Sequence, residues 1–496
     1  MMTRAAAPAA DRVALADGRR AITCTELGPL VDAEQAWLRS SGGSRFALLA
    51  DNGCGWVLAD LALHRSALLN VPLPGYFTIG QLHHVISDAG IDTLLTDQPE
   101  RATQLATDFV PAGISAQTGL HLFRRRTGTT AQPVPPATIK ITYTSGSTAA
   151  PKGVCLSAQS LDAVAASLAA ATADFGLTRH LCLLPLATLL ENIGGVHAAL
   201  RSNASCIVPS LQTTGMSYGH LDPRKLLAAI TAHEPSSLIL VPELLRVLVM
   251  AAQQGWQPPA SLRFIAVGGA SVAPELLASA EQCGLPVYEG YGLSECGSVV
   301  CVNTASANRR GSVGRPLPHV RVRLDGQQQI MVSGPLMSGY LGDAERPDAA
   351  TGELATGDLG EIDADGFVHV RGRLKNLIIT SLGRNISPEW VERELQMEAS
   401  IGMAVVFGEA KPYLSALICA AGAADHARID AAVARANARL PDYAQLRRWA
   451  VVTTPFTLAN GLLTANGRPR RAQILEQHGR VLESLYPKAT ETEAAF

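Results

Sequence analysis

The segment LLTANGRPRR, residues 462–471, places three arginines directly behind an Asn-Gly pair. Asn-Gly marks a turn, and runs of charge usually face water, so a solvated basic turn is the ordinary interpretation. An arginine, however, can also hold two anionic oxygens at once through its planar fork of donors. We therefore ask whether Arg468, Arg470 or Arg471 reaches a reacting anion.

A second segment, YTSGSTAAPKG at residues 143–153, joins small and hydroxylated residues to a lysine. It follows a predicted strand at 139–145. Small residues let backbone N–H groups converge on an anion, hydroxyls add donors, and Lys152 supplies charge. The Walker A pattern is not satisfied. Taken alone, the loop is as compatible with a flexible turn as with a phosphate cradle.

A third segment, VYEGYGLSECGS at residues 287–298, carries Glu295 behind a Gly-Tyr-Gly triplet. Mg²⁺ commonly takes one carboxylate from a protein and its other ligands from phosphate and water, so Glu295 is a candidate metal ligand. A glutamate that caps a turn is the alternative. The triplet lacks the third glycine of a dinucleotide fingerprint, which sets a Rossmann protein aside.

Two further segments carry groups suited to a nucleotide. AVGGASVAPELL (266–277) has two glycines after a predicted strand, which permits close approach of a ligand to the backbone. In ATGDLGEIDADGFVHVRGRLKNLI (355–378), the Asp358 carboxylate can accept from two hydroxyls and Arg373 offers a fork of donors. Asp358 and Asp365 as simple turn residues are the alternative.

In this order, the segments resemble the motifs of the adenylate-forming superfamily, which includes acyl- and aryl-CoA synthetases, peptide-synthetase adenylation domains and firefly luciferase. The resemblance extends from about residue 45 to 475, and the string EGYGLSE is similar to the long-chain acyl-CoA synthetase branch. It implies a ligase that uses ATP and Mg²⁺ to convert a carboxylic acid to acyl-AMP and then transfers the acyl group to coenzyme A. A fatty or other apolar acyl chain is the first expectation for the acid, and an aryl acid is the second.

The resemblance also implies roles for single residues. Glu295 would hold Mg²⁺, Lys152 would meet phosphate, Tyr291 would flank adenine, and Asp358 and Arg373 would hold the ribose. The residues implied to contact ATP or AMP are Thr144, Ser145, Gly146, Ser147, Thr148, Gly269, Ala270, Glu289, Gly290, Tyr291, Gly292, Ser294, Asp358 and Arg373. The loop departs from the family at Ala149, where a glycine is usual, and this predicts a stiffer loop.

Two departures from the family flank the expected position of the acid's carboxylate. A catalytic lysine of the family lies in a segment like N-G-x-L-T-x-x-x-K-x-x-R, and Arg468 stands in its place. Within LPLATLLEN (184–192), Thr188 stands where the family has a histidine, and a hydroxyl can donate a hydrogen bond but carries no positive charge. Three outcomes remain open: Arg468 does the work, Arg470 or Arg471 enters instead, or adenylation is weak.

The C-terminal part is expected to move during the reaction. The resemblance places a hinge at Lys375, within about 373–376, and assigns SLGRNISPEWVE (381–392) to a loop that enters the site for the thioester step. Gly383 would then line the tunnel for the incoming thiol. An ordinary helix start, with Ser387 as cap and Pro388 in the first turn, is compatible with this role.

Two alternatives to a CoA ligase follow from the same residues. The first is an acyl-AMP ligase that loads an acyl carrier protein, which would release pyrophosphate without CoA. The second is a degenerate member that binds nucleotide or acyl ligands with weak adenylation, and Arg468 and Thr188 are the reasons to consider it.

Composition excludes several other classes. The 496 residues carry a formal net charge of −2, which argues against a nucleic-acid binder. None of the nine cysteines forms C-x-x-C, so buried free thiols in a reducing cytoplasm are expected. The N-terminus lacks the apolar region of a signal peptide, and no stretch of about 20 apolar residues suggests a transmembrane segment. We expect a cytoplasmic protein.

The pattern of elements predicts an α/β fold. We expect a large N-terminal domain, 1–373, of parallel sheets layered with helices, because short apolar runs alternate with helical patterns. Its part at about 311–373 has short strands between Gly-Asp turns, which indicates a small antiparallel β-barrel or meander. A small, mobile α+β domain, 376–496, follows. Predicted strands are 44–51, 68–73, 91–97, 139–145, 181–186, 204–210, 236–242, 262–269, 320–324, 329–334, 360–366, 367–373, 403–408, 415–420 and 449–456, and predicted helices are 54–67, 81–90, 160–175, one opening at Pro388, and 424–440.

Overall fold

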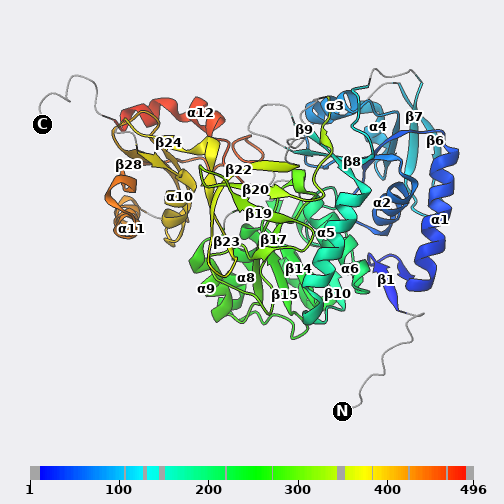
Figure 1. The fold of residues 1–496 in the computed structure, drawn as a ribbon, viewed down its shortest axis with the longest axis horizontal. Coiled ribbons are helices and arrows are strands. Elements are labelled where there is room, and N and C mark those ends of the chain that lie inside the picture. The colour runs from blue at the N-terminus through cyan, green and yellow to red at the C-terminus, as the bar shows by residue number, and fades with distance from the viewer. Residues whose placement is uncertain are drawn as a thin grey trace, which may run out of the picture.

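The computed structural model describes residues 12–105, 108–126, 131–144, 151–217, 220–270, 272–342, 352–381, 384–422, 425–464 and 467–486. Figure 1 shows a large body that contains the N-terminal and central elements, with the elements from α10 to α12 gathered in a smaller lobe at one end. None of the helices in these residues has both the length and the apolarity to cross a membrane.

The first of two large sheets has the strand order β21-β9-β8-β4-β3-β5-β7-β6. Its centre, β8-β4-β3-β5, is parallel, and the flanking pairs are antiparallel. The central strands are buried along nearly their whole length, as expected for a sheet covered on both faces. The bounds are β3 Arg45–Leu49, β4 Leu69–Pro72, β5 Thr93–Thr96, β6 Phe109–Ile114, β7 His121–Arg125, β8 Thr138–Thr144, β9 Lys152–Ser157 and β21 Gly339–Tyr340.

The second large sheet has the order β18-β17-β16-β15-β14-β10-β11-β1-β2, and its strands from β16 to β1 are parallel. The carboxyl ends of parallel strands lie at the same edge of a sheet, so the residues that follow these strands come together at that edge. The bounds are β1 Val13–Ala16, β2 Ala21–Thr23, β10 Arg179–Leu181, β11 Ser205–Ile207, β14 Ser237–Leu240, β15 Phe264–Val267, β16 Val287–Tyr291, β17 Cys301–Val302 and β18 Arg315–Pro316.

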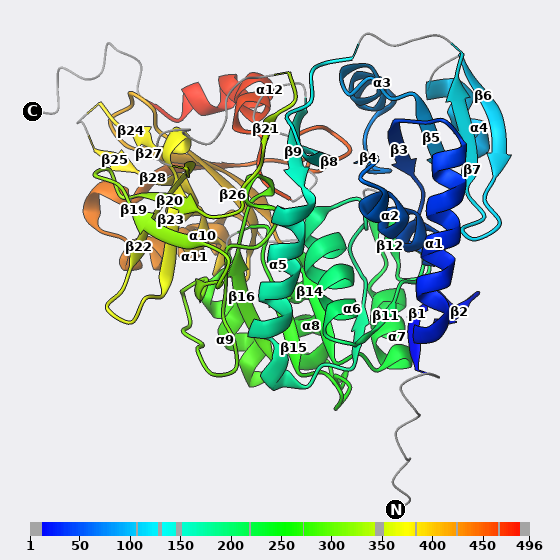
Figure 2. The same cartoon turned by 45° about the vertical axis from the view of Figure 1, so that its right-hand side comes forward.

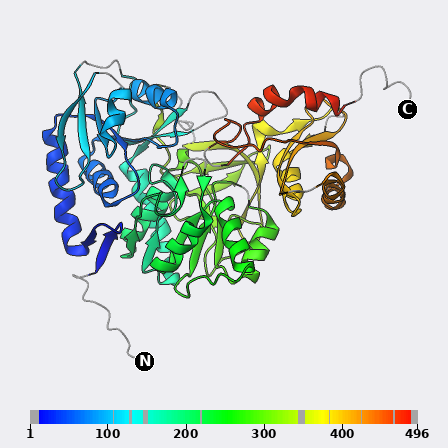
Figure 3. The ribbon, with the colours of Figure 1, turned by 180° about the vertical axis from the view of Figure 1, so that it is seen from behind.

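Helices cover both sheets, as Figures 2 and 3 show from two sides. Helix α5 contacts β8 and β9 of the first sheet and also α6 and η3, while α8 contacts β14 of the second. The bounds are α1 Cys24–Ser40, α2 Cys54–Ser66, α3 Ile79–Asp88, α4 Pro99–Leu105, α5 Ala158–Ala171, η2 Ala173–Phe175, η3 Leu190–His197, α6 Ala198–Arg201, α7 Pro223–His233, α8 Pro242–Gln253, α9 Pro274–Gln282 and η4 Ser294–Cys296. Strand β12, Met216–Ser217, pairs antiparallel with β13, His220–Leu221. These layers confirm the predicted α/β fold class.

A four-stranded antiparallel sheet, β19-β20-β22-β23, occupies the region where a small barrel or meander was predicted. Its strands are β19 Arg321–Leu324, β20 Gln329–Ser333, β22 Glu353–Ile362 and β23 Val368–Arg373. The strand predicted at 360–366 is placed differently, because β22 begins seven residues earlier and the chain turns from Asp363 to Gly366. Pairing of β22 with both β20 and β23 extends this strand across the Thr-Gly-Asp motif.

The C-terminal lobe packs helices on a three-stranded sheet, β26-β27-β28, around its own apolar core. Its predicted helices and two of its predicted strands are present, and Pro388 does open a helix. The strand predicted at 449–456 is shifted, because β28 spans Leu446–Val451. The division into domains at 373–376 stays a prediction. The bounds are η5 Leu374–Asn376, β24 Ile378–Ile379, β25 Asn385–Ile386, α10 Pro388–Gln396, β26 Ile401–Phe407, β27 Leu414–Ala420, α11 His426–Arg439, η6 Asp442–Ala444, β28 Leu446–Val451 and α12 Arg471–Ser484.

Candidate active site

A cavity of about 1140 Å³ lies where the carboxyl ends of β14, β15 and β16 face the end of β8 and the C-terminal lobe. Its wall is built from segments that follow those strands, as expected at the carboxyl edge of a parallel sheet. Of the predicted residues, the following line it: Thr144, Lys152, Thr188, Gly269, Gly290, Tyr291, Gly292, Ser294, Glu295, Arg373, Lys375 and Arg468. Motifs separated by more than 300 residues in sequence therefore share one cavity.

Arg468 crosses from the C-terminal lobe into this cavity. Its Nε and Nη2 both donate to the carbonyl oxygen of Gly269, at 3.1 and 2.7 Å. A tight turn holds the loop, because Thr464 accepts from the Arg468 backbone N–H and Gly467 donates to Thr464. Burial, and then the nearby Arg373, lower the pKa of the Arg468 guanidinium, while Asp358 opposes that shift. The guanidinium is thus held among protein groups at the cavity wall.

The other two arginines of the segment lie elsewhere in this arrangement. Arg471 begins α12 and forms an ion pair of 2.7 Å with Glu392 inside the C-terminal lobe, where it also donates to the carbonyl of Val406. The backbone N–H of Arg470 donates to Leu462. Neither residue lines the cavity within the described residues.

Lys152 and Glu295 approach the cavity from two different sheets. Lys152 is the first residue of β9, and its ammonium lies 5.4 Å from the ring centroid of Tyr340. The hydroxyl of the same Tyr340 donates to Glu295 Oε1 at 2.9 Å. Tyr340 therefore links the two charged groups. The rest of the predicted phosphate loop, Ser145, Gly146, Ser147 and Thr148, lies outside the described residues.

Asp358, Tyr291 and Arg373 form one hydrogen-bonded set. Asp358 is buried in β22, where Arg373 Nε donates to its Oδ1 at 2.7 Å and the Tyr291 hydroxyl donates to its Oδ2 at 2.6 Å. Burial, with the adjacent Asp358 carboxylate, raises the pKa of the Tyr291 hydroxyl well above its usual value. Both Asp358 oxygens already accept a hydrogen bond from a protein donor, and their remaining lone pairs are what a ribose would use.

Two glycines of these motifs occupy positions where a side chain would be strained or would overlap neighbouring backbone. Gly269 has φ of +80°, a conformation that L side chains rarely adopt, and a Cβ on Gly292 would overlap the carbonyl of Ser298. Ala270 follows Gly269 but does not line the cavity. Glu289, also predicted at the nucleotide, points away from the cavity, and burial raises its pKa to about 7 while Arg393 on α10 opposes that rise. The Glu289 side chain thus faces the C-terminal lobe.

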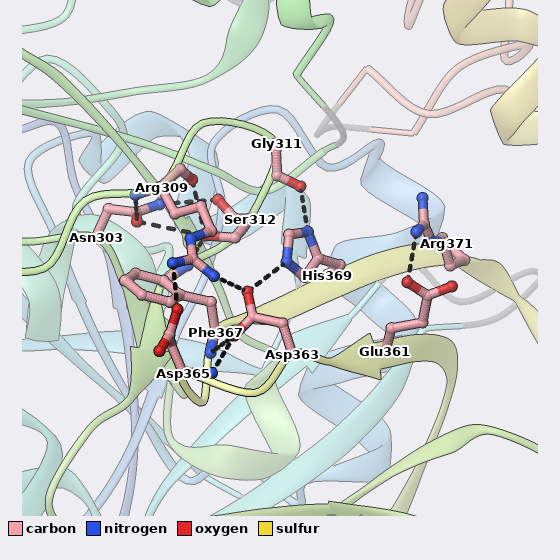
Figure 4. Close-up of polar contacts among 11 residues, drawn as sticks. Asn303, Arg309, Gly311, Ser312, Glu361, Asp363, Asp365, Phe367, His369 and Arg371 are labelled. Carbon is pink, nitrogen blue, oxygen red and sulfur yellow. Dashed lines mark hydrogen bonds and ion pairs between the residues drawn. The ribbon is translucent and has the colours of Figure 1, made fainter.

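A polar cluster supports β16 from behind (Figure 4). Asn303 donates to the carbonyl of Glu289 at 3.1 Å and to that of Ser312 at 2.8 Å. Arg309 pairs with Asp363 and Asp365. Figure 4 also shows His369 between the carbonyl of Gly311 and Asp363, at 3.0 and 3.2 Å. These contacts tie the Asp363–Gly366 turn to the loop behind the Gly-Tyr-Gly motif.

Thr188 lies at the cavity wall, where its hydroxyl donates to the Pro185 carbonyl at 2.7 Å. The segment after it forms a π-helix, η3, a conformation that sequence patterns did not predict and that often occurs at functional sites. Glu191 on η3 pairs with the buried His180 at 2.8 Å and accepts from the backbone N–H of Leu184 at 2.9 Å. Glu191 thereby fixes the LPLATLLEN segment beside the cavity.

Lys375 lies in η5 and lines the cavity, and burial followed by Arg373 lowers the pKa of its ammonium. Gly383, predicted for the thiol tunnel, lies outside the described residues. The polar residues that line the cavity and that the sequence did not predict include Glu243 and Gln329. A signal for Glu243 was present, because it follows a predicted parallel strand at 236–242, whereas Gln329 gave none.

The sequence matches two models of one enzyme family. The family model described as "AMP-binding enzyme" matches residues 2–341, and the model "AMP-binding enzyme C-terminal domain" matches 375–490. A long-chain-fatty-acid–CoA ligase, FadD15, of Mycobacterium bovis is 26% identical, covering 94% of this chain and 92% of that protein. A feruloyl-CoA synthase of an Amycolatopsis species is 30% identical, covering 80% and 83%.

Among solved structures, the o-succinylbenzoate CoA synthetase MenE from Bacillus subtilis, in complex with its acyl-adenylate intermediate, superposes with a TM-score of 0.73. It is 23% identical, with 94% of this chain and 95% of that chain covered, and it supports the fold. The chain belongs to the AMP-binding enzyme family and is an enzyme. Membership of the adenylate-forming superfamily, implied by the motifs, is confirmed.

Proposed function

We propose that this member of the AMP-binding enzyme family activates a carboxylic acid with ATP to acyl-AMP and then transfers the acyl group to the thiol of coenzyme A. The observation that carries the proposal is the convergence of Lys152, Glu295 and Arg468 on one cavity, with Asp358 behind its wall, bonded to the lining residues Tyr291 and Arg373. A cavity that combines two cations, a free carboxylate oxygen and an apolar wall fits an acid and a nucleotide together.

In the first half-reaction, the acid's carboxylate attacks the α-phosphate of ATP. Two anions must meet, so preorganised cations have to offset their repulsion. Arg468 is the candidate for the junction of carboxylate and α-phosphate, where its fork replaces the single ammonium of the family lysine. Lys152 is the candidate for the outgoing pyrophosphate.

Magnesium fits the donor set beside Lys152. Glu295 uses one oxygen toward Tyr340, and a carboxylate oxygen is the hard ligand that Mg²⁺ prefers. Glu295 would hold the ion, which would supply charge neutralisation at the phosphates. The other ligands would come from phosphate and water.

In the second half-reaction, a thiol displaces AMP from the acyl group. We propose that rotation at Lys375 withdraws Arg468 and brings the segment with Gly383 to the thiol. Coenzyme A is favoured as acceptor over an acyl carrier protein because the relatives reported above are named CoA ligases.

We propose an apolar acid as substrate, with a fatty chain ahead of an aryl acid. Part of the cavity wall, here called the apolar arm, is formed by side chains of one hydrophobic cluster, and this supports either choice. Its residues include Leu168, Leu177, Ala198, Phe264, Ala266 and Val299. A cytoplasmic location is proposed on the nine cysteines, which are unpaired thiols.

The test is pyrophosphate release with ATP, Mg²⁺ and a panel of fatty and aryl acids, each with and without CoA. Release that leads to acyl-CoA supports the proposal. Release and transfer to a phosphopantetheinylated carrier without any CoA product would select the acyl-AMP ligase. Binding of nucleotide without pyrophosphate from any acid would select the degenerate member.

A further inference from the structure

Glu243 is a carboxylate in the cavity wall that none of the motifs predicted. It lies in the first turn of α8, directly after β14, and borders the cavity beside Val241 and Leu244. No hydrogen bond or ion pair joins its side chain to another described side chain; Arg246, one turn further on the same helix, acts on it only through charge. A site that must accept a carboxylate and a polyanion therefore holds an extra acidic group.

The loop that carries Arg468 borders Glu243 on one side, while the rest of the Glu243 side chain is exposed. Gly467 has φ of +73°, and a Cβ placed there would lie 2.9 Å from Glu243 Oε1. On the other side, Val241 lies against Gly269, whose carbonyl accepts both bonds from Arg468. Glu243 thus stands at the seam between α8 and the C-terminal loop, next to the proposed site of carboxylate and phosphate.

The position of this seam favours a role for Glu243 toward the incoming thiol over a role in recognising the acid substrate. The acyl group is proposed to fill the apolar arm of the cavity and AMP the arm at Tyr291 and Arg373. A thiol must then approach the acyl carbon from a third direction, and Leu463, Thr464, Gly467 and Arg468 border that direction in this arrangement. When these residues withdraw, the exposed Glu243 borders the vacated space.

We propose that Glu243 is the general base that deprotonates the incoming thiol in the second half-reaction; this inference rests on the proposed function. The thiol proton passes to a Glu243 oxygen as sulfur forms its bond to the acyl carbon. The bond from that carbon to the phosphate oxygen breaks, and AMP leaves with the electron pair. Glu243 then returns its proton to water.

The surroundings of Glu243 suit that role. Burial raises the pKa of its carboxyl group, while its own backbone N–H at the helix start and Arg246 oppose the rise. A base works best when its pKa approaches the working pH, because it must be ionised yet still attract a proton. The thiolate, and not the thiol, is the nucleophile.

The experiment supplies acyl-AMP and measures thioester formation by wild type, Glu243→Gln and a matched control, Glu281→Gln, whose glutamate forms a surface ion pair with Arg310. Two thiols are compared: CoA, and 4-nitrothiophenol, which is already ionised at neutral pH. With CoA at pH 7 we expect Glu243→Gln to be slower by about 10²-fold, the usual effect of losing a positioned base. With the ionised thiol we expect a change of no more than a few-fold, and Glu281→Gln should match wild type with both.

An equal loss with both thiols, or no loss with CoA, overturns the proposal. Acyl-AMP formation by the same variants is measured as pyrophosphate release, and an equal loss in both half-reactions also overturns it. If Glu243→Gln instead weakens binding of acids that bear an amino group and leaves thioester formation intact, Glu243 recognises substrate. Failure of wild type to release pyrophosphate with any acid sinks the proposed function separately, because the supplied acyl-AMP bypasses that step.

Discussion

Arg468 meets the carbonyl of Gly269 through two donors at once, a contact that a lysine ammonium could make with only one hydrogen at a time. Charge and reach could be predicted for this arginine from its residue type, and the structure adds its entry into the cavity. Arg471 is engaged with Glu392, so of the three alternatives the geometry favours Arg468 as the group near the reacting phosphate.

We predict that Arg468→Ala lowers acyl-AMP formation by at least about 10²-fold, because it removes a preorganised cation from the developing charge. Thioester formation from supplied acyl-AMP should be retained. Both half-reactions are measured with Arg447→Ala as control, since that arginine forms an exposed pair with Asp442 in the same lobe. Equal loss in both half-reactions would refute the assigned role.

Some residues of the site could be predicted and others could not. Glu295, Asp358 and Arg373 lie in segments with recognisable spacing, and the structure brings all three to the same region. Tyr340, which joins Lys152 to Glu295, lies in a two-residue strand whose partner β9 is distant in sequence. Local patterns carry no information on such a pairing. The nucleotide contact of Glu289 stays a prediction, because this carboxylate is not among the residues that line the cavity and it interacts through charge with Arg393.

At the scale of elements, η3 and α6 present small residues to the cavity at helical spacing. Gly194, Gly195, Ala198, Ala199 and Ser202 all line it. A Cβ on Gly194 would lie 3.5 Å from Ile239 Cδ1 and 3.8 Å from Leu168 Cδ1, which are ordinary contacts. An alanine would therefore fit at position 194, whereas a longer side chain would have to extend into the cavity that Gly194 lines.

We predict that Gly194→Leu shifts substrate preference toward shorter acids. The added side chain would occupy the apolar arm, and each methylene lost from the bound chain changes discrimination by about 10-fold or more. The measurement is kcat/KM for a series of acids of increasing length, with Gly194→Ala as control. A proportional loss for all lengths would contradict the assignment of this arm to the acyl chain.

The π-helix is also tied to a buried charge network. Lys140 donates to Asp60 at 2.7 Å and to Asn192 of η3 at 2.5 Å, and His197 of η3 contacts Asp60 at 2.9 Å. Although burial raises the Asp60 pKa, Lys140 and His197 outweigh that effect and hold it far below its usual value. Sequence periodicity predicted none of this, because Asp60 and Lys140 lie 80 residues apart within otherwise apolar elements.

We predict that Asp60→Asn destabilises the protein by about 3–5 kcal/mol, because it leaves the Lys140 ammonium buried without a counter-charge. The thermal unfolding midpoint should fall, and Asp32→Asn, at an exposed pair with Arg65, should leave it unchanged. Since the folded pKa of Asp60 is depressed, its contribution is present above about pH 4, the unfolded value, and declines as the pH falls below it. An Asp60→Asn midpoint equal to wild type near neutral pH would contradict this account.

At the scale of the whole molecule, the large body and the C-terminal lobe meet around the cavity, and Lys375 lies where the chain passes from one to the other. Alternating apolar runs were sufficient to predict the layered sheets. The relative placement of the lobe could not be predicted, since it depends on side chains such as Arg393 and Arg468 that contact distant segments.

We predict that Lys375→Pro slows thioester formation at least about 10-fold relative to Lys375→Ala, because proline restricts the backbone dihedral needed for rotation. Both variants lose the ammonium, so their difference isolates the hinge. Thioester formation from supplied acyl-AMP and pyrophosphate release are the two measurements. A thioester rate that is equal in the two variants would place the hinge elsewhere.

The bond between Arg468 and Gly269 has a thermodynamic consequence for the first substrate to bind. A backbone carbonyl already engages two of the five donors of the guanidinium that the reaction needs. A substrate must compete with that internal acceptor, so its apparent affinity falls by the fraction of molecules in which the arginine is released. The carbonyl of Gly269 thus acts as a built-in competitor, and it sets how strongly an anion must bind before the reaction can begin.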